Sequence, residues 1–358
     1  MTTRFTHGGN IYQGSQEWLD FSANINPLGL SPVVRQAIEH HIDGIIHYPD
    51  PDGTALKQAL SAYYAVPEEY LLLGNGAAEL LYTYFHARQG QRVVVPAPTF
   101  SEYERAARAG KGTVQYIQTV AAQGFAVPWQ AFTDALGAAD IVIFTNPNNP
   151  TGRLITRDEL VSFIEEAQKR NIMVLVDESF LDFRTDREAY TVMPCVRHYH
   201  NLMVLQSLTK FFALPGLRLG FAVMAPMLRH ELEGHKDVWN VNVLAQYAGV
   251  AALRDKEYQY RSRDYVRQEK AYLAQSLQGL GDMTVYEPSV NFILLQLGKS
   301  WGTADDVQAG LRRQGILVRN CAAYAGLDDQ YIRVAVRTHR ENEGLLQALQ
   351  AYKKERLL

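Results

Sequence analysis

The sequence predicts an α/β fold with a large domain, in which a mostly parallel sheet is wrapped by helices, and a smaller α+β domain. Three observations predict this class: short apolar runs without polar alternation, amphipathic helices between them, and a change to long polar helices after about residue 240. Strands covered on both faces read as continuous apolar runs, and strands joined by crossover helices lie parallel in one sheet. We therefore expect the sheet between about residues 70 and 225.

The candidate strands of this sheet are five short apolar runs. They are Arg92–Pro96, Ile141–Thr145, Ile172–Val176, Leu202–Leu205 and Leu219–Met224. The clearest intervening helix runs from Thr156 to Arg170, where Thr156 and Glu159 have the spacing of a capping box. Its apolar face is formed by Leu160, Phe163, Ile164 and Ala167. This order of strand, helix and strand predicts repeated parallel βαβ units.

The smaller domain is predicted from the last third of the chain. A long polar helix from Glu257 to Gln278 precedes strand-like segments at Asn291–Leu297 and Tyr331–Val336. A last helix begins at Thr338, with Glu341 in capping-box spacing. Ser31-Pro32 starts an earlier helix, and we expect the N-terminal segment to pack beside the smaller domain. The chain is thus divided into a large domain, 45–240, and a small domain, 1–44 with 241–358.

Composition excludes several kinds of partner. The formal net charge of -3 provides no basic field for nucleic acid or anionic lipid. Cys195 and Cys321 lack metal-ligand or disulfide spacing, so we expect buried thiols and no metal. The longest apolar region, Phe211 to Leu228, contains Arg218 and two prolines, which argues against a membrane span. With no apolar leader at the start, we expect a cytoplasmic protein.

Two ionisable residues follow predicted strands. Lys210 lies in the apolar segment Ser207–Arg218, and a lysine desolvated in this way has a lowered pKa and can form a Schiff base with a carbonyl. On residue type alone a surface lysine is commoner, but the apolar neighbours favour the nucleophile. Asp177 closes Ile172–Val176, where α/β proteins assemble sites, and is placed to hold a pyridinium nitrogen protonated. A helix cap explains Asp177 equally well.

Two loops carry further signals. Small residues in Gly74–Glu79 precede an apolar helix, and such a helix N-terminus presents amide groups to a phosphate, although most glycine pairs are only turns. The loop Asn146–Gly152 contains three asparagines and two prolines, which predict a rigid turn that presents side-chain amides at the edge of the sheet. A structural turn explains each residue of this loop but not the whole string.

Taken in order, the segments GNGAAE, PTF, NPNNPTG, VDESF and SLTKFFALPGLRLGF resemble the fold-type-I aminotransferase superfamily, in particular its histidinol-phosphate aminotransferase branch. The resemblance covers nearly the whole chain. It implies the fold of these pyridoxal 5'-phosphate enzymes, with Lys210 bound to the cofactor aldehyde. It also implies that Asp177 pairs with the pyridine nitrogen and that Asn149 donates to the 3-oxygen of the ring.

The same resemblance implies the remaining cofactor contacts. Gly76, Ala77, Ser207 and Arg218 would hold the cofactor phosphate. Phe100 would stack on the ring, with Tyr103 as the second candidate. His47–Pro51 is similar to the family segment whose tyrosine, here Tyr48, crosses a dimer interface to the neighbour's phosphate. The resemblance therefore implies a symmetric homodimer with shared active sites, and a locally packed loop aromatic is the alternative for Tyr48.

Both termini resemble one group within that superfamily, the threonine-phosphate decarboxylases. The similar segments are His7–Asn10, Asp20–Gly29, Val318–Asp328 and Ile332–Arg337. The resemblance implies that Arg333 holds the substrate's α-carboxylate, while Arg319, His7 and Asn24 surround the substrate phosphate. A solvated N-terminus is the alternative for His7. The short link between His7–Asn10 and Asp20 departs from the longer family segment and leaves the reach of His7 open.

A further pointer is Phe180, because the aminotransferases usually place a tyrosine there whose hydroxyl bonds the cofactor's 3-oxygen. We expect pyridoxal phosphate-dependent decarboxylation of O-phospho-L-threonine to aminopropanol O-phosphate, a product that the resemblance assigns to the cobalamin nucleotide loop. A histidinol-phosphate-type aminotransferase is the alternative. A non-catalytic regulator on this fold is opposed by the presence of Lys210, Asp177 and Asn149. Phosphoserine differs from phosphothreonine by one methyl group, which a pocket discriminates by only about 1–3 kcal/mol.

Overall fold

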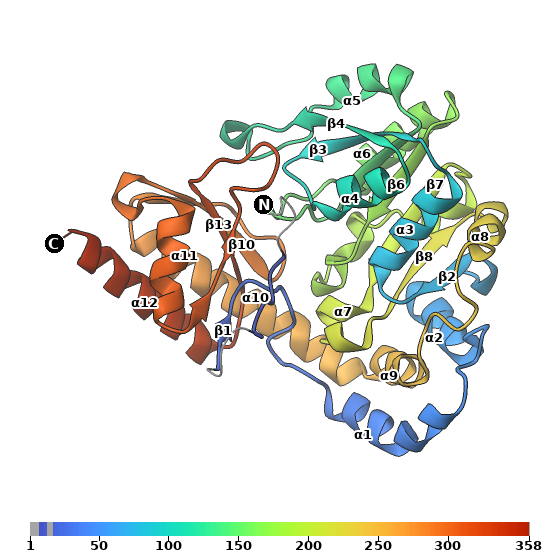
Figure 1. The fold of residues 1–358 in the computed structure, drawn as a ribbon, viewed down its shortest axis with the longest axis horizontal. Coiled ribbons are helices and arrows are strands. Elements are labelled where there is room, and N and C mark those ends of the chain that lie inside the picture. Colours follow the sequence, from blue (N-terminus) through green and yellow to red (C-terminus); the bar gives the residue numbers. More distant parts are fainter. Residues whose placement is uncertain (1–6, 13–16, 358) are drawn as a thin grey trace.

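A seven-stranded sheet forms the centre of the computed structural model, which describes residues 7–12 and 17–357 (Figure 1). In spatial order the strands are β2 (Leu71–Gly74), β8 (Gly220–Met224), β7 (Leu202–Ser207), β6 (Met173–Asp177), β5 (Ile141–Thr145), β3 (Arg92–Ala97) and β4 (Thr113–Gln118). The strands β4, β3, β5, β6 and β7 run parallel. The predicted α/β class with a mostly parallel sheet is confirmed.

The parallel order predicted up to about residue 225 is wrong for its last strand. Strand β8 runs antiparallel to both neighbours, β7 and β2. Only a short segment joins β7 to β8, and it holds the helix α7 (Leu208–Phe211) and one 3₁₀ turn. The four-residue helix α7 spans only about 6 Å, whereas a parallel return must travel back along a strand of about 20 Å, so this segment closes as an antiparallel connection. The tight connection is the part of the chain that carries Lys210.

Helices cover both faces of the sheet. One face packs against α3 (Ala77–Ala87), α4 (Glu102–Ala109) and α8 (Pro226–Glu233). The other packs against α2 (Thr54–Tyr64), α5 (Trp129–Ala135), α6 (Arg157–Gln168) and α9 (Val243–Arg254). Along β5, Ile143 faces the first layer and Phe144 the second, and both are fully buried. Because each such side chain stabilises the fold by roughly 1.5–3 kcal/mol, both faces select apolar residues and no alternation remains.

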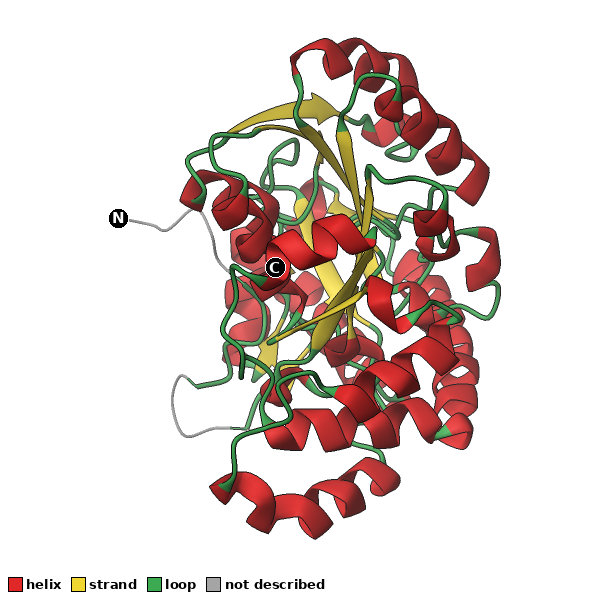
Figure 2. Ribbon diagram, turned by 90° about the vertical axis from the view of Figure 1, so that its right-hand side faces the viewer, coloured by secondary structure: helices red, strands yellow, loops and turns green. Residues whose placement is uncertain are grey.

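The smaller domain is a four-stranded antiparallel sheet covered by helices (Figures 1 and 2). Its strands are β12 (Arg319–Asn320), β13 (Tyr331–Ala335), β10 (Phe292–Leu297) and β9 (Met283–Val285), in that order. Its helices are α10 (Lys256–Gly279), α11 (Ala304–Arg313) and α12 (His339–Leu357). The strand β1 (Leu19–Asp20) pairs with β11 (Ile316–Leu317), so the start of the chain is joined to this domain.

The helix α1 (Pro32–His41) packs differently from the rest of the N-terminal segment. It lies on α9, and its buried Val34 belongs to the core on one face of the large sheet. The helix α9 contributes to the same core, although it follows residue 240. The division into 45–240 and 1–44 with 241–358 stays a proposal, and this packing places α1 and α9 with the large sheet.

The predicted helix starts agree with the structure in their capping bonds. Thr156 and Glu159 form a reciprocal capping box at α6, and Thr338 with Glu341 makes the same bonds before α12. Ser31 caps α1. Short 3₁₀ segments lie at Ile42–Ile46, Glu68–Tyr70, Ala121–Gln123, Leu136–Ala138, Leu181–Phe183, Arg187–Ala189, Met193–Arg197, Pro215–Leu217 and Lys299–Trp301. Among the described residues, no helix has the length and apolar character needed to cross a membrane.

Candidate active site

A cavity of about 490 Å³ lies at the carboxyl ends of β5, β6 and β7. Its walls come from three parts of the chain: the ends of the large sheet, the strands β12 and β13 of the smaller domain, and the N-terminal segment. The predicted residues that line it are His7, Asn24, Ala77, Phe100, Asn149, Asp177, Ser207, Lys210, Arg218, Arg319 and Arg333. Its volume suits a small-molecule ligand, and the carboxyl ends of parallel strands are the usual position for one.

Lys210 reaches this cavity from α7, directly after β7. Burial and the neighbouring cations Arg218 and Arg333 together lower the pKa of Lys210 to about 8, and the Asp177 carboxylate opposes part of this shift. A lysine in this state has a substantial uncharged fraction near neutral pH, and the uncharged amine is the nucleophile. The expected chemistry of Lys210 therefore has a physical cause in its neighbours.

Asp177 lies at the end of β6 and is held by donors on both carboxylate oxygens. Ser179 donates to Oδ1 from its amide at 3.0 Å and its hydroxyl at 2.5 Å, and the Tyr103 hydroxyl donates to Oδ2 at 2.8 Å. Burial raises the pKa of Asp177, while these donors and Lys210 oppose the rise. The carboxylate closes a local turn through Ser179 and also faces the cavity.

The two candidates for ring stacking have different positions. Phe100 lines the cavity and is only partly buried. Tyr103 is fully buried, and its hydroxyl contacts Thr145 Oγ1 at 2.7 Å as well as Asp177. The ring of Phe100 meets that of Tyr103 edge-on. This geometry favours Phe100 as the stacking residue and gives Tyr103 a hydrogen-bonding task that the sequence did not indicate.

One end of the cavity is suited to a phosphate. The helix α3 begins at Ala77, and its N-terminus exposes backbone amides there. Gly76 has a φ of +83°, and a Cβ at this position would collide with the guanidinium of Arg218. Ser207 caps α7, and its hydroxyl lies 2.6 Å from that of Thr209. A glycine is thus required at Gly76 so that Arg218 can approach the helix N-terminus.

The other end of the cavity carries two buried arginines on neighbouring strands. Arg319 of β12 lies directly opposite Arg333 of β13 in the antiparallel register. Like charges directly opposite one another are destabilising, so a bound anion would relieve the repulsion. Arg333 donates to Asn149 Oδ1 and, at 2.8 Å, to the Ser22 carbonyl. Its buried Nε has no hydrogen-bond partner among the described residues and can donate to a ligand.

The N-terminal residues meet the cavity wall. His7 Nε2 lies 2.8 Å from Glu102 Oε1, so the ring contacts the cavity wall although its side chain is 41% exposed. The Gly9 amide donates to Ser22 Oγ at 2.8 Å and connects this segment to the loop that follows β1. Asn24 is buried, and its Oδ1 has no hydrogen-bond partner among the described residues.

Tyr48 does not line the cavity of this single chain. Its side chain is 77% exposed and stacks on Trp239, with ring centroids 4.3 Å apart. Other large apolar residues nearby in the sequence, Ile45 and Ile46, are also exposed. The exposed surface of these residues is compatible with a contact to a second chain.

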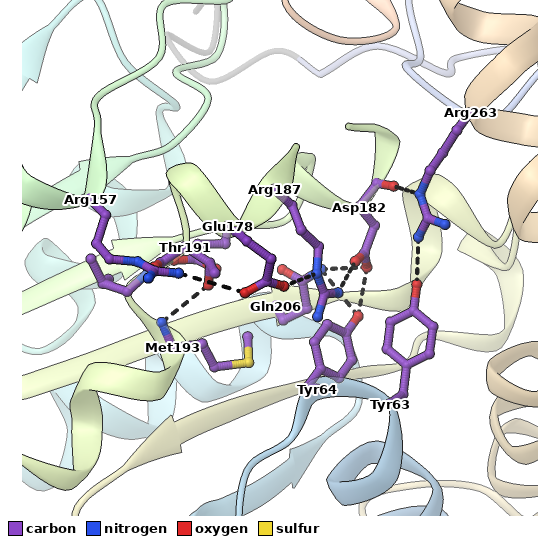
Figure 3. A network of polar contacts seen from close by, with 12 residues as sticks. Tyr63, Tyr64, Arg157, Glu178, Asp182, Arg187, Thr191, Met193, Gln206 and Arg263 are labelled. Atoms are coloured by element: carbon purple, nitrogen blue, oxygen red, sulfur yellow. Dashed lines mark hydrogen bonds and ion pairs between the residues drawn. The ribbon is translucent and has the colours of Figure 1, made fainter. Parts of the chain in front are cut away.

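A buried polar network supports the strands that carry Asp177 and Ser207 (Figure 3). Asp182 accepts hydrogen bonds from Tyr64 at 2.6 Å, Gln206 at 2.7 Å and Arg187 at 3.0 Å. Glu178 accepts from the Thr191 hydroxyl at 2.6 Å, and burial raises the pKa of Glu178 to about 7. The network joins β6 and β7 to α2, so it restrains the ends of both strands.

Four residues that line the cavity were assigned no role from the sequence. Ser22 and Tyr324 lie within the segments Asp20–Gly29 and Val318–Asp328, whereas Glu102 and Arg105 lie outside every segment that carried a signal. Glu102 follows the PTF segment by one residue, but only the folded chain brings it to His7. No group of three or more His, Cys, Asp or Glu in the described ranges could hold a metal ion.

The arrangement fits the predicted cofactor. A helix N-terminus with Arg218 suits its phosphate, a desolvated Lys210 suits its aldehyde, and Asp177 suits a ring nitrogen. The φ of +83° at Gly76 is a conformation that favours glycine, and without a Cβ there the guanidinium of Arg218 lies close to the backbone. A substrate with two anionic groups could then bind to the opposed arginines, Arg319 of β12 and Arg333 of β13.

Comparisons with known proteins identify the relatives of this chain. Residues 16–349 match the family described as "Aminotransferase class I and II". The threonine-phosphate decarboxylase of Salmonella typhimurium is 37% identical over 361 residues, which cover 96% of this chain and 95% of that protein. The structure of L-threonine-O-3-phosphate decarboxylase from Porphyromonas gingivalis is 25% identical, with a TM-score of 0.82 over 93% of this chain and 99% of that chain. The histidinol-phosphate aminotransferase of Clostridium acetobutylicum is 26% identical, with a TM-score of 0.88 over 94% and 99% of the two chains.

Proposed function

The chain belongs to the class I and II aminotransferase family, and we propose that it removes carbon dioxide from O-phospho-L-threonine to give aminopropanol O-phosphate. It is a pyridoxal phosphate enzyme of the carboxy-lyase type, and its product serves the nucleotide loop of cobalamin. Full-length similarity to decarboxylases, with 37% identity to the Salmonella typhimurium enzyme, supports this reaction.

The proposal is supported above all by the opposed positions of Arg319 and Arg333. Together they present two buried guanidinium groups to one small cavity. O-phospho-L-threonine has two anionic groups, a carboxylate and a phosphate, and the planar guanidinium binds either one bidentately. A substrate with both anions offsets the repulsion between these side chains, which a singly charged amino acid does less well.

Phe180 supports decarboxylation over amino transfer. It is buried and packs edge-on against Phe292, with ring centroids 5.1 Å apart. It offers no hydroxyl at the position where the aminotransferases usually have one, so the 3-oxygen of the ring would depend on Asn149. The loss of this donor changes the electron demand of the ring.

The residues of this chain divide the work of the reaction. When bound, pyridoxal phosphate accepts the electrons of the bond that breaks at the substrate's α-carbon. Lys210 would hold the cofactor at its aldehyde and would hold a proton near the substrate's α-carbon. Asp177 would keep the ring nitrogen protonated, and Arg333 would bind and orient the substrate carboxylate. Arg319 anchors the phosphate at the far end.

The remaining site residues complete the proposal. Gly76, Ala77, Ser207 and Arg218 hold the cofactor phosphate, Phe100 stacks on the ring, and Asn149 donates to its 3-oxygen. His7 and Asn24 join Arg319 around the substrate phosphate, supported by their place on the cavity wall.

We also propose a cytoplasmic homodimer with shared active sites. The exposed ring of Tyr48, outside the cavity of its own chain, supports a contact with the cofactor phosphate of a second subunit. A symmetric pair would place one Tyr48 in each site. In a dimer of one Tyr48→Ala chain and one Lys210→Ala chain, one of the two sites would contain both an intact Lys210 and an intact Tyr48. Activity recovered on mixing the two variants would therefore show that the sites are shared between subunits.

Carbon dioxide release tests the reaction. The protein, loaded with pyridoxal phosphate, is incubated with O-phospho-L-threonine and no keto acid. We expect catalytic release of carbon dioxide under these conditions. Turnover only with histidinol phosphate and 2-oxoglutarate would show an aminotransferase instead, as the structural similarity to the Clostridium acetobutylicum enzyme allows.

A further inference from the structure

Two carboxylates line the cavity among the described residues, Asp177 and Glu102. Asp177 has its place beside the cofactor ring. Glu102 has no such place, because the proposed substrate is anionic and the same wall carries the cations that would bind it. A second buried carboxylate in a site for two anions lowers their affinity unless it serves another group. The position of Glu102 therefore requires an explanation.

Glu102 is the first residue of α4, and three side chains donate to it. His7 Nε2 lies 2.8 Å from Oε1, the Tyr82 hydroxyl lies 3.0 Å from Oε2, and Arg105 Nη1 lies 3.5 Å from Oε1. The carboxylate side chain is only 10% exposed. Burial acts to raise the pKa of Glu102, but the hydrogen bonds from His7 and Tyr82, together with the charges of His7 and Arg105, hold the pKa below its ordinary value. Glu102 is thus charged near neutral pH and only accepts hydrogen bonds.

This contact fixes the hydrogen on the imidazole. A carboxylate can only accept, so His7 Nε2 must carry a hydrogen and donate it. Nδ1 is then the ring nitrogen that is left for a ligand. In the protonated ring both nitrogens donate, one to Glu102 and the other to a phosphate oxygen, and Glu102 supplies the counter-charge.

The same contact connects the segment His7–Gly9 to the large domain. The segment that carries His7 is tied to Ser22 by the Gly9 amide, and Glu102 joins it to α4, 95 residues away in sequence. Tyr82 extends the connection to α3, whose N-terminus at Ala77 meets the cofactor phosphate. The substrate end and the cofactor end of the site are therefore linked through one carboxylate.

We infer that Glu102 is a positioning residue that orients His7 as a donor to the substrate phosphate. The inference rests on the proposed function, because it assigns Glu102 to the phosphate end of the same substrate. The direction in which phosphate binding changes on removal of Glu102 distinguishes this role from a purely electrostatic one. If Glu102 were only an anion beside the site, its removal would strengthen phosphate binding, whereas loss of a positioned donor weakens it.

Steady-state kinetics with O-phospho-L-threonine show whether removal of Glu102 strengthens or weakens substrate binding. We expect Glu102→Ala and His7→Ala each to raise KM about 10-fold, the loss of one charge-assisted hydrogen bond, with kcat changed less than about twofold. The double variant should be no worse than either single one, because both remove the same interaction. Glu102→Gln keeps the side-chain volume and an oxygen acceptor, so its KM should lie between those of the wild type and Glu102→Ala.

Glu104→Gln is the matched control. Glu104 lies on the same helix, is buried, and pairs with Arg108 at 2.7 Å and Tyr116 at 2.9 Å, but it does not line the cavity. Its replacement should leave KM unchanged. Melting temperature and cofactor absorbance show whether Glu102→Ala folds. If it does not, the KM of the isosteric Glu102→Gln is compared with that of the wild type instead.

A binding measurement separates this inference from the proposed function. Calorimetric titration of the cofactor-loaded protein with inorganic phosphate should show weaker binding in Glu102→Ala than in Glu104→Gln. If the wild type releases no carbon dioxide but Glu102→Ala still binds phosphate more weakly than Glu104→Gln, the proposed reaction is wrong and the role of Glu102 stands. An active wild type with unchanged or lower KM in both Glu102 variants, or with additive losses in the double variant, would overturn that role.

Discussion

The lowered pKa of Lys210 predicts how the protein captures its cofactor. Burial and the cations Arg218 and Arg333 bring this pKa from 10.5 to about 8, a difference of about 3 kcal/mol. At pH 7.4 about 20% of such an amine is uncharged, against about 0.1% of an ordinary lysine. The structure thus gives Lys210 roughly a two-hundredfold larger nucleophilic fraction near neutral pH.

The rate of covalent capture, followed by absorbance after mixing cofactor-free protein with pyridoxal phosphate, measures this pKa. Because only the uncharged amine reacts, the rate should rise about tenfold per pH unit below pH 8 and level off above it. Replacing Arg333 by Met removes one neighbouring cation and should move the break to higher pH. The exposed Lys169 is the matched control, and Lys169→Ala should leave the pH dependence of the capture rate unchanged.

A rate that keeps rising through pH 9.5 would refute the reasoning, since it would show a lysine with an ordinary pKa. Lys210→Ala should lose the link that borohydride makes permanent while its melting temperature shows a folded protein. A variant that still traps the cofactor covalently would show that another lysine does this work.

Three further predictions concern the fold around the site. Gly76→Ala should weaken pyridoxal phosphate binding at least about tenfold and lower the free energy of unfolding by about 1–2 kcal/mol. The reasons are that the φ of Gly76 is +83° and that the new Cβ would meet Arg218. Fluorescence titration measures the binding, and thermal unfolding measures the stability. Phe144→Ala should cost about 3–5 kcal/mol of unfolding free energy without changing KM, and a loss below about 1 kcal/mol would contradict its fully buried position. Burial raises the pKa of Glu178 from 4.5 to about 7, so the folded state binds the extra proton between these values and wild-type stability should fall as pH rises from about 4.5 to 7. Glu178→Gln should remove this part of the pH dependence, and identical pH profiles for the two proteins would show that Glu178 does not titrate there.

The sequence predicted those parts of the site that are local in the chain. Lys210, Asp177 and Asn149 each follow a buried strand, and the carboxyl ends of parallel strands meet at one edge of a sheet. The strand positions themselves were readable because burial on both faces selects continuous apolar runs. The structure brings these side chains to one cavity, as the order of strands and loops predicted.

Features that depend on distant contacts were not predictable in this way. Strand β8 is as apolar as the parallel strands of the sheet, and its antiparallel direction follows from a connection to β7 whose helix has only four residues. The edge strand β4 alternates between exposed and less exposed residues, so it gave no continuous run. Tyr103 was considered only for stacking, because its bond to Asp177 joins residues 74 positions apart.

Carbon balance with labelled substrate distinguishes decarboxylation from amino transfer in one reaction. O-phospho-L-threonine labelled with carbon-13 in its carboxyl group is incubated with the cofactor-loaded protein, and carbon-13 and phosphorus-31 spectra are recorded together. The account predicts one labelled bicarbonate for each aminopropanol O-phosphate formed, with no keto acid added. Label that stays on the phosphorylated product, or a keto product that appears only when an amino acceptor is supplied, would contradict it.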